Sequence, residues 1–161
     1  MSKPSLGVQT QFPLHPSKGE TLKQALIFQP LIALFGLVFV VWFTMFLRHS
    51  IFLKKTGLEA QAIAMPEQVM AVFPDSVRLA GNNLRNLFEL PVIFVAVCFC
   101  IYLTGTVDVF YLRAAWLYVG LRAAHSLIHC TINRVNARFL VWFVSCIVLW
   151  TLVARLGLSL F

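Results

Sequence analysis

Two groups of polar side chains interrupt the apolar stretches of this 161-residue chain, and each group has the spacing of one helical face. Successive helix residues are rotated by about 100°, and on that rotation the first group falls within an arc of about 100°. We therefore predict a polar stripe made of Arg78, Asn82, Arg85, Asn86 and Glu89. Guanidinium groups beside a single carboxylate are suited to binding an anionic ligand.

A second polar stripe is predicted on a later helix, within a similar arc of about 100°. Its members are Arg122, His125, Ser126, His129 and Asn133. A short connection that contains Gly105 lies between the two stripes and predicts an antiparallel hairpin. The start of the first helix and the end of the second then lie at the same side, so we expect the stripes to face one another.

The charged members of these stripes need partners, because a charge near the centre of a bilayer costs about 2.5 to 3.5 kcal/mol. In one interpretation the groups satisfy each other, with Glu89 paired to Arg122 or Arg85, and only lock the helices together. In the other, the surplus positive charge binds an anion. We predict an anionic ligand, since several cations surround one carboxylate.

A metal site is the third interpretation of the same residues. His125 and His129 are spaced to present two imidazoles on one side of a helix, and Glu89 could complete a set of three ligands. Arg122 beside them would repel a cation, and the glutamate of the metalloprotease motif is missing. We therefore expect hydrogen-bonded histidines and no metal. The four cysteines lack metal or redox spacing and are expected to be small buried hydrophobes.

The elements that position these residues are predicted to be membrane helices. Sixty per cent of the residues are hydrophobic and only 12% are charged, which is outside the range of a soluble domain. A bilayer core of about 30 Å takes roughly 20 helical residues, which leaves room for four spans. We predict an all-α integral membrane protein, an up-down-up-down four-helix bundle formed by one domain. Its predicted parts are a flexible polar tail over 1–23, a domain over 24–161, and spans over about 26–47, 84–104, 107–131 and 139–156.

The connections between the spans carry further signals. The long first connection contains "LEAQAIAMPEQVMAVF", which predicts a short interfacial helix interrupted at Pro66. The net charge of +7 is scattered between the spans, so we expect phospholipid headgroups and not nucleic acid as partners. Seven basic residues flank the first and third loops and five flank the other side, which places those two loops in the cytoplasm. The chain has no G-x-S-x-G motif, no glycine-rich phosphate loop and no pair of catalytic carboxylates.

The runs "NNLRNLFELPVIF" and "LRAAHSLIHCTINRVNARFLVW" resemble the MAPEG family, the membrane-associated proteins of eicosanoid and glutathione metabolism, and look most like its bacterial branch. The resemblance covers about Asp75 to Arg155. It implies a homotrimer of four-helix bundles, here in a bacterial inner membrane, with glutathione held between neighbouring subunits near the cytoplasmic face. Members of the family conjugate glutathione to hydrophobic electrophiles or reduce lipid hydroperoxides.

The resemblance also implies roles for the polar stripes, with glutathione as co-substrate. Its two carboxylates suit Arg78, Arg85 and Arg122, and its ammonium suits Glu89 with help from Asn86. Asn82, His125 and His129 would be polar contacts, although the family has an arginine at the first of these positions and tyrosines on the third helix. A free thiol has a pKa near 8.5, so a guanidinium of Arg134 or Arg138 would raise its reactive fraction.

A different class of function is compatible with the same residues. The chain would then be a non-catalytic membrane module whose polar stripes bind lipid headgroups or fix the oligomer. Binding of a small thiol distinguishes the two hypotheses.

Overall fold

The computed structural model describes residues 23–160, and every regular element in that range is a helix. The predicted tail lies outside the described residues, except for Lys23. The elements in chain order are α2 (Phe28–Thr56), the 3₁₀-helix η1 (Ala60–Ile63), α3 (Pro66–Val72), α4 (Asp75–Leu87), α5 (Leu90–Leu103), α6 (Val109–Cys130) and α7 (Val135–Leu160). This architecture confirms the all-α part of the predicted fold class, and the four-helix bundle and the homotrimer stay predictions.

Three helical segments of the described chain are long and apolar enough to cross a membrane, namely Lys23–Thr56, Asp75–Leu103 and Val135–Leu160. They confirm the prediction of an integral membrane protein. The helix α6 is not among them, because its polar residues lower its mean hydropathy. Its 22 residues correspond to about 33 Å, so it is long enough to cross, and the fourth span stays a prediction.

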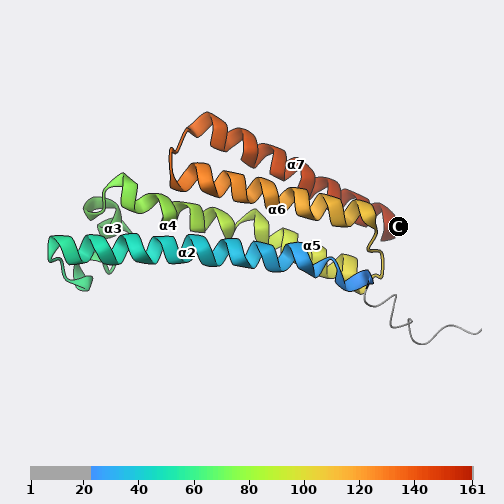
Figure 1. The fold of residues 1–161 in the computed structure, drawn as a ribbon, viewed down its shortest axis with the longest axis horizontal. Helices are drawn as coiled ribbons and strands as arrows, with labels where there is room; N and C mark the ends of the chain where they lie inside the picture. The colour runs from blue at the N-terminus through green and yellow to red at the C-terminus, as the bar shows by residue number, and fades with distance from the viewer. Residues whose placement is uncertain (1–22, 161) are drawn as a thin grey trace, which may run out of the picture.

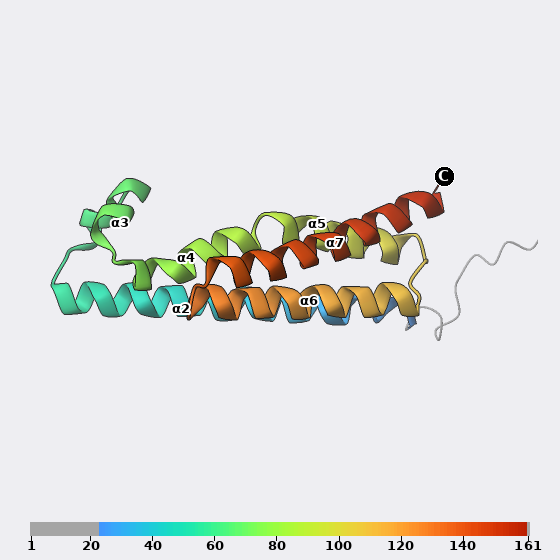
Figure 2. The same ribbon diagram turned by 90° about the horizontal axis from the view of Figure 1, so that it is seen from above.

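The long helical segments lie side by side and run in alternate directions along the long axis of the molecule (Figure 1). The helix α2 packs along α4 and α6, and α6 also contacts α4 and packs most extensively on α7. Figure 2 shows α3 at one end of the molecule, beside the last turns of α2. Pro66 is the first residue of α3 and separates it from η1, as the sequence predicted.

The helix α2 is longer than the predicted first span and ends at Thr56. Gly57 follows in the left-handed conformation with φ of 67°, and its N–H donates to the carbonyl of Leu53 at 3.0 Å. A glycine adopts this conformation without steric cost, so it terminates the helix. The extra turns carry Arg48, Lys54 and Lys55.

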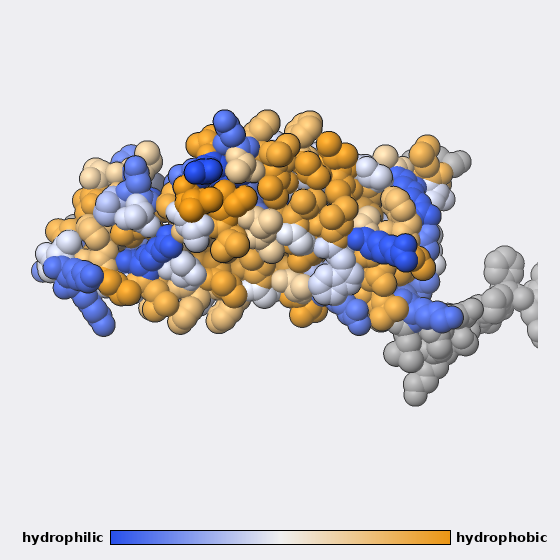
Figure 3. Space-filling view, turned by 45° about the horizontal axis from the view of Figure 1, so that its top comes forward, coloured by the Kyte–Doolittle hydropathy of each residue, from blue (hydrophilic) through white to orange (hydrophobic). Residues whose placement is uncertain are grey.

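The interior is apolar where the helices cross. The rings of Phe94 on α5 and Tyr118 on α6 are stacked with centroids 4.4 Å apart, and Ala115 beside them is completely buried. Large apolar side chains also cover much of the outside, including Phe39 and Trp42 on α2. Figure 3 shows hydrophobic side chains over the middle of the molecule and hydrophilic ones toward its two ends, as expected for a protein surrounded by lipid.

The second predicted span is broken between α4 and α5. Glu89 stands in the break with φ of −91° and ψ of −107°, so the expectation that it shares one continuous helix with Asn86 is wrong. Pro91 explains the break, because it has no N–H to donate and its ring would collide with the carbonyl of Leu87. The last carbonyl groups of α4 are consequently left without partners in their own helix.

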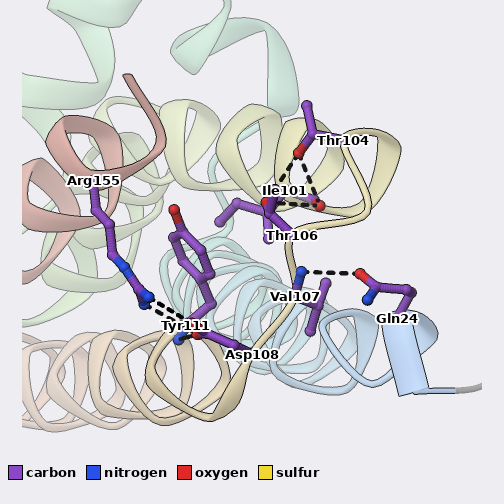
Figure 4. Close-up of polar contacts among 8 residues, drawn as sticks. All are labelled: Gln24, Ile101, Thr104, Thr106, Val107, Asp108, Tyr111 and Arg155. Carbon is purple, nitrogen blue, oxygen red and sulfur yellow. Dashed lines mark hydrogen bonds and ion pairs between the residues drawn. The ribbon is translucent and has the colours of Figure 1, made fainter. Parts of the chain in front are cut away.

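A set of polar contacts joins the helix ends at the end of the molecule farthest from α3 (Figures 1 and 4). Asp108 caps the start of α6, and its carboxylate accepts the N–H of Tyr111 at 2.8 Å. Arg155 on α7 donates to both oxygens of that carboxylate, at 3.1 and 2.5 Å, and its guanidinium lies 4.4 Å from the ring centroid of Phe110. The hydrogen bond from Arg155 holds the pKa of the Asp108 carboxyl below its ordinary value.

Two substitutions of Asp108 separate its two structural roles. In Asp108→Asn the side-chain amide retains an oxygen that caps the helix but cannot form the ion pair, so this variant is expected to have a lower midpoint of thermal unfolding in detergent at pH 7. Because the folded-state pKa is depressed, the ion pair stabilises the fold above the ordinary aspartate pKa of about 4 and is lost as pH falls below it. The difference between wild type and Asp108→Asn should therefore shrink near about pH 3.

The cap gives a second comparison at the same position. Asp108→Ala removes the cap as well, and loss of a cap costs about 1 kcal/mol. It is expected to unfold below Asp108→Asn at both pH values, as measured by circular dichroism. Equal midpoints for wild type and Asp108→Asn at pH 7 would show that the contact with Arg155 contributes nothing to stability.

Candidate functional site

A polar pocket forms where the break after α4, the second half of α6 and the start of α7 meet. Its volume is about 320 Å³. The lining residues are Asn86, Glu89, His125, Val135, Arg138, Phe139 and Trp142. Side chains of both predicted stripes thus contribute to one site, together with a cation and two aromatic rings from α7.

The two stripes are in direct contact behind this pocket. The side-chain amide nitrogen of Asn86 lies 3.4 Å from Nδ1 of His129. The guanidinium of Arg122 donates from Nη2 to the main-chain carbonyl of Asn86 at 2.9 Å. This carbonyl is one of those left without a helical partner by the break at Pro91, so Arg122 caps the C-terminal end of α4.

Arg122 is completely buried, yet most of its guanidinium is unpaired. Neither Nε nor Nη1 has a hydrogen-bond partner in the described part of the chain. Between residues 23 and 160 the ion pairs are Arg78 with Asp75 and Arg155 with Asp108, so Glu89 does not pair with Arg122 or Arg85. A buried cation without an anion is strongly disfavoured. This arrangement favours a bound anion over mutual satisfaction of the stripes.

The histidines are held in defined orientations by their neighbours. Nδ1 of His125 lies 3.2 Å from the main-chain carbonyl of Arg138, so this nitrogen carries the proton and donates it. Nε2 of the same ring is then an acceptor, and it has no partner among the described residues. The ring of His129 lies beside it, with centroids 5.6 Å apart. The pocket therefore offers acceptors as well as a cation.

Arg138 is positioned by the turn between α6 and α7. Its Nη1 donates to the side-chain oxygen of Asn133 at 2.6 Å. Asn133 has φ of 45°, a conformation that asparagine tolerates better than most residues, and its N–H donates to the carbonyl of Ile128 at 2.8 Å. Arg134 is exposed on the same turn and does not line the pocket.

The remaining members of the first stripe lie away from this pocket. Arg78 pairs with Asp75 and donates to the carbonyl of Met70 at 2.9 Å, so it tethers the connection that precedes α4. Asn82 and Arg85 are exposed on α4 and do not line the pocket. The structure therefore brings six of the ten predicted site residues together and leaves four apart. The six are Asn86, Glu89, Arg122, His125, His129 and Arg138.

Sequence reasoning missed the aromatic wall of the site and a buried amide next to it. Phe139 and Trp142 follow Arg138 by one and four residues, and the second spacing places Trp142 on the same helical face. Asn83 is completely buried, and its side-chain oxygen lies 3.5 Å from Oγ of Ser126. The position of Asn83 three residues before Asn86 is the signal that could have identified it.

The polar pocket adjoins an apolar groove between the start of α5 and α7. The groove has a volume of about 590 Å³. It is lined by Leu90, Trp142, Phe143, Cys146, Ile147, Trp150, Thr151 and Ala154. Trp142 lines both cavities, so a polar molecule in the pocket and an apolar one in the groove would meet beside its ring.

No group of three histidine, cysteine, aspartate or glutamate residues in the described range is arranged to hold a metal ion. What the pocket offers is a cation, a carboxylate, an imidazole and an amide beside an apolar groove. Such a site is suited to positioning a small zwitterionic molecule against an apolar one.

Comparison with known proteins identifies the group of proteins to which this chain is related. The model of the MAPEG family matches residues 27–158, which is most of the chain and includes every residue of the pocket and the groove. No curated protein and no solved structure matches. The chain belongs to the MAPEG family.

Proposed function

We propose that this protein is a glutathione-dependent membrane enzyme that conjugates glutathione to hydrophobic electrophiles or reduces lipid hydroperoxides. The observation that carries the proposal is the buried, largely unpaired guanidinium of Arg122 behind a polar pocket that adjoins an apolar groove. Membership of the MAPEG family supports a glutathione-related activity of this kind.

Glutathione fits the charges of the pocket. Its ammonium group would lie against Glu89, which is exposed and has no ion-pair partner in the described range. A carboxylate would lie toward Arg138 and the interior guanidinium of Arg122, and supply the anion that this cation lacks. The lone pair on Nε2 of His125 would accept an N–H of the ligand. Arg78 forms an ion pair with Asp75, so it is not one of the proposed ligand contacts.

Arg138 is the residue to which we assign thiol activation, in preference to Arg134. A thiol is a poor nucleophile until it loses its proton, and an adjacent guanidinium stabilises the thiolate. In a transferase reaction the thiolate forms a bond to an electrophilic carbon. In a peroxidase reaction it attacks the O–O bond, the lipid leaves as an alcohol, and a second glutathione converts the sulfenic acid into a disulfide and water.

An assembly of several copies would complete the site. Asn82, Arg85 and Glu89 are exposed on a segment that is apolar and long enough to span a membrane, and polar groups facing lipid are unfavourable. A neighbouring copy would cover them, and the resemblance to the family favours a homotrimer of four-helix bundles. The exposed Arg85 would then contact a ligand held between neighbours.

The positive-inside rule supports a cytoplasmic location for the site. The end of α2, the start of α4 and the turn between α6 and α7 lie toward the same end of the molecule (Figure 1). That end carries the seven basic residues of the first and third loops and their flanks. We therefore place this end at the cytoplasmic face, in a bacterial inner membrane as the resemblance implies.

Replacement of Arg138 tests thiol activation. Arg138→Ala is expected to lower the rate of conjugation of glutathione to a chlorinated nitrobenzene by about 100-fold, the usual effect of removing a donor that stabilises developing negative charge. The affinity for glutathione, measured by calorimetry, should fall much less. The ultraviolet absorbance of bound thiolate should disappear in the variant.

Arg134→Ala provides the matched comparison for this test, because it removes a cation from the same turn but outside the pocket. It is expected to keep most of the activity and the thiolate absorbance. If Arg134→Ala loses both while Arg138→Ala keeps them, the assignment to Arg138 is wrong.

Glu89→Gln tests the proposed contact with the ammonium group. It removes the charge without changing the size, and loss of a charge-assisted hydrogen bond is expected to weaken glutathione binding by about tenfold. Glutathione with an acetylated amino group should bind wild type about tenfold more weakly and should lose nothing further in Glu89→Gln. Glu67→Gln, on α3, serves as the control acid.

The same measurement separates the enzyme from a non-catalytic membrane module. If the protein is a non-catalytic module, millimolar glutathione should neither bind nor stabilise the wild-type protein. In that case Glu89→Gln should also lower the midpoint of thermal unfolding. Binding to wild type with an unchanged midpoint in the variant supports the enzyme.

A further inference from the structure

A further groove lies at the basic end of the molecule, where the end of α2, the start of α4 and the end of α6 meet. Its volume is about 540 Å³, which is within the range of small-molecule sites. Residues that line it include Arg48, Ile51, Phe52 and Lys55 on α2, Ser76 on α4 and Cys130 on α6. It shares no lining residue with the polar pocket or the apolar groove, so this basic groove is a separate cavity.

The depth of the basic groove in the membrane follows from the sequence of α2. Residues 28–47 of this helix contain no charged side chain, and a helix of about 20 residues crosses the roughly 30 Å of a hydrocarbon core. Arg48 is the first cation after this stretch, and Lys55 follows about two helical turns later. The basic groove therefore begins where the hydrocarbon ends and continues through the level of the lipid headgroups.

Arg48 is fixed in the basic groove by two main-chain carbonyls. Its Nη1 donates to the carbonyl of Ser76 at 3.0 Å, and its Nη2 donates to the carbonyl of Cys130 at 2.8 Å. These bonds join the end of α2 to the start of α4 and to the last residue of α6. A guanidinium has further N–H groups that can bind a ligand. The groove thus holds a cation in place before any ligand arrives, which lowers the entropic cost of binding.

The charge of the basic groove is positive and unbalanced. Among the described residues no aspartate or glutamate lines it. The ion pairs between residues 23 and 160 join Arg78 to Asp75 and Arg155 to Asp108, so they leave Arg48 and Lys55 without an acidic partner. Two cations at the level of the headgroups are complementary to the phosphate of a lipid.

Apolar side chains in the same groove favour a lipid over a free phosphate compound. On α2, Ile51 and Phe52 lie between the two cations, and Ile51 is 50% exposed. On α4, Leu79 lines the groove one turn deeper in the membrane than Ser76, because α4 runs opposite to α2. A ligand that carries phosphate and hydrocarbon together would cover both kinds of surface.

We propose that the basic groove is a binding site for one anionic phospholipid of the surrounding leaflet. Its phosphate lies between Arg48 and Lys55, and an acyl chain passes Leu79 into the hydrocarbon. The site is built within one chain and uses none of the residues assigned to glutathione, so it does not depend on the proposed enzymatic function.

The test measures lipid binding to the purified full-length protein in a neutral detergent, without glutathione, by native mass spectrometry. Dioleoyl phosphatidylglycerol is expected to bind about tenfold more tightly than dioleoyl phosphatidylcholine, whose headgroup has no net charge. Glycerol 1-phosphate at millimolar concentration should not displace the anionic lipid. Equal affinity for the two lipids would overturn the proposal, and so would displacement by glycerol phosphate, which would indicate a site for soluble phosphate compounds.

Two neighbouring lysines separate a defined site from diffuse attraction to the protein. Lys55→Gln is expected to weaken binding of phosphatidylglycerol about fivefold and to leave that of phosphatidylcholine unchanged. Lys54→Gln is the matched control, because Lys54 is also exposed on α2 but does not line the basic groove. Equal losses in the two variants would show that only the net charge matters and would overturn the proposal.

Filling the basic groove tests its shape while leaving both cations and the hydrogen bonds of Arg48 in place. Ile51→Trp should weaken binding of phosphatidylglycerol about tenfold, because the larger side chain occupies the space of the lipid. Leu47→Trp, one turn earlier on α2 and also exposed, lies outside the groove and should have no effect. Unchanged affinity in Ile51→Trp would place the lipid elsewhere on the protein and contradict the proposal.

Discussion

The hydrogen bond from Arg122 to the carbonyl of Asn86 connects the broken helical segment Asp75–Leu103 to α6. Pro91 leaves carbonyl groups at the end of α4 without helical partners, and such groups cannot remain unsatisfied away from water. A guanidinium suits this position because its planar array of donors can hold one carbonyl and still present further N–H groups elsewhere. The buried cation therefore stabilises the break through this carbonyl.

The location of the pocket follows from this pairing. The break turns Glu89 out of the helical path, so its carboxylate lines a cavity between α4 and α7 instead of continuing the stripe along α4. Arg122 brings α6 against the same point, and the contact between Asn86 and His129 holds it there. The turn at Asn133 then places Arg138 over the opening. Glu89 and Arg138 are thus each positioned by a backbone irregularity.

Much of this arrangement could be predicted from the sequence, because helical periodicity and short connections determine which polar residues share a face and an end. They brought Asn86, Glu89 and His125 to one region, where the structure has them lining one pocket, whereas Arg138 was suggested only by the family resemblance. Periodicity could not separate the members of a stripe about 100° wide, since such a stripe faces two neighbours at once. It grouped Asn82 and Arg85 with Asn86, although the first two are exposed on the outside of α4.

The break at Glu89 and the aromatic lining from α7 could not be predicted from helical periodicity. Pro91 carries the signal for the break, but the φ and ψ of Glu89 depend on how the two half-helices pack. The aromatic residues of α7 could equally face lipid or a ligand, because both surroundings are apolar. The packed structure is needed to show that Trp142 lines both the groove and the polar pocket. It is also needed to show that Phe139 lines the polar pocket.

The junction at Trp142 brings two chemical environments together that a soluble enzyme would have to create separately. A polar thiol compound can approach from the end of the molecule, where basic residues gather, while an apolar compound diffuses laterally in the bilayer into the groove along α7. Neither has to leave the phase in which it dissolves, so little desolvation opposes their encounter.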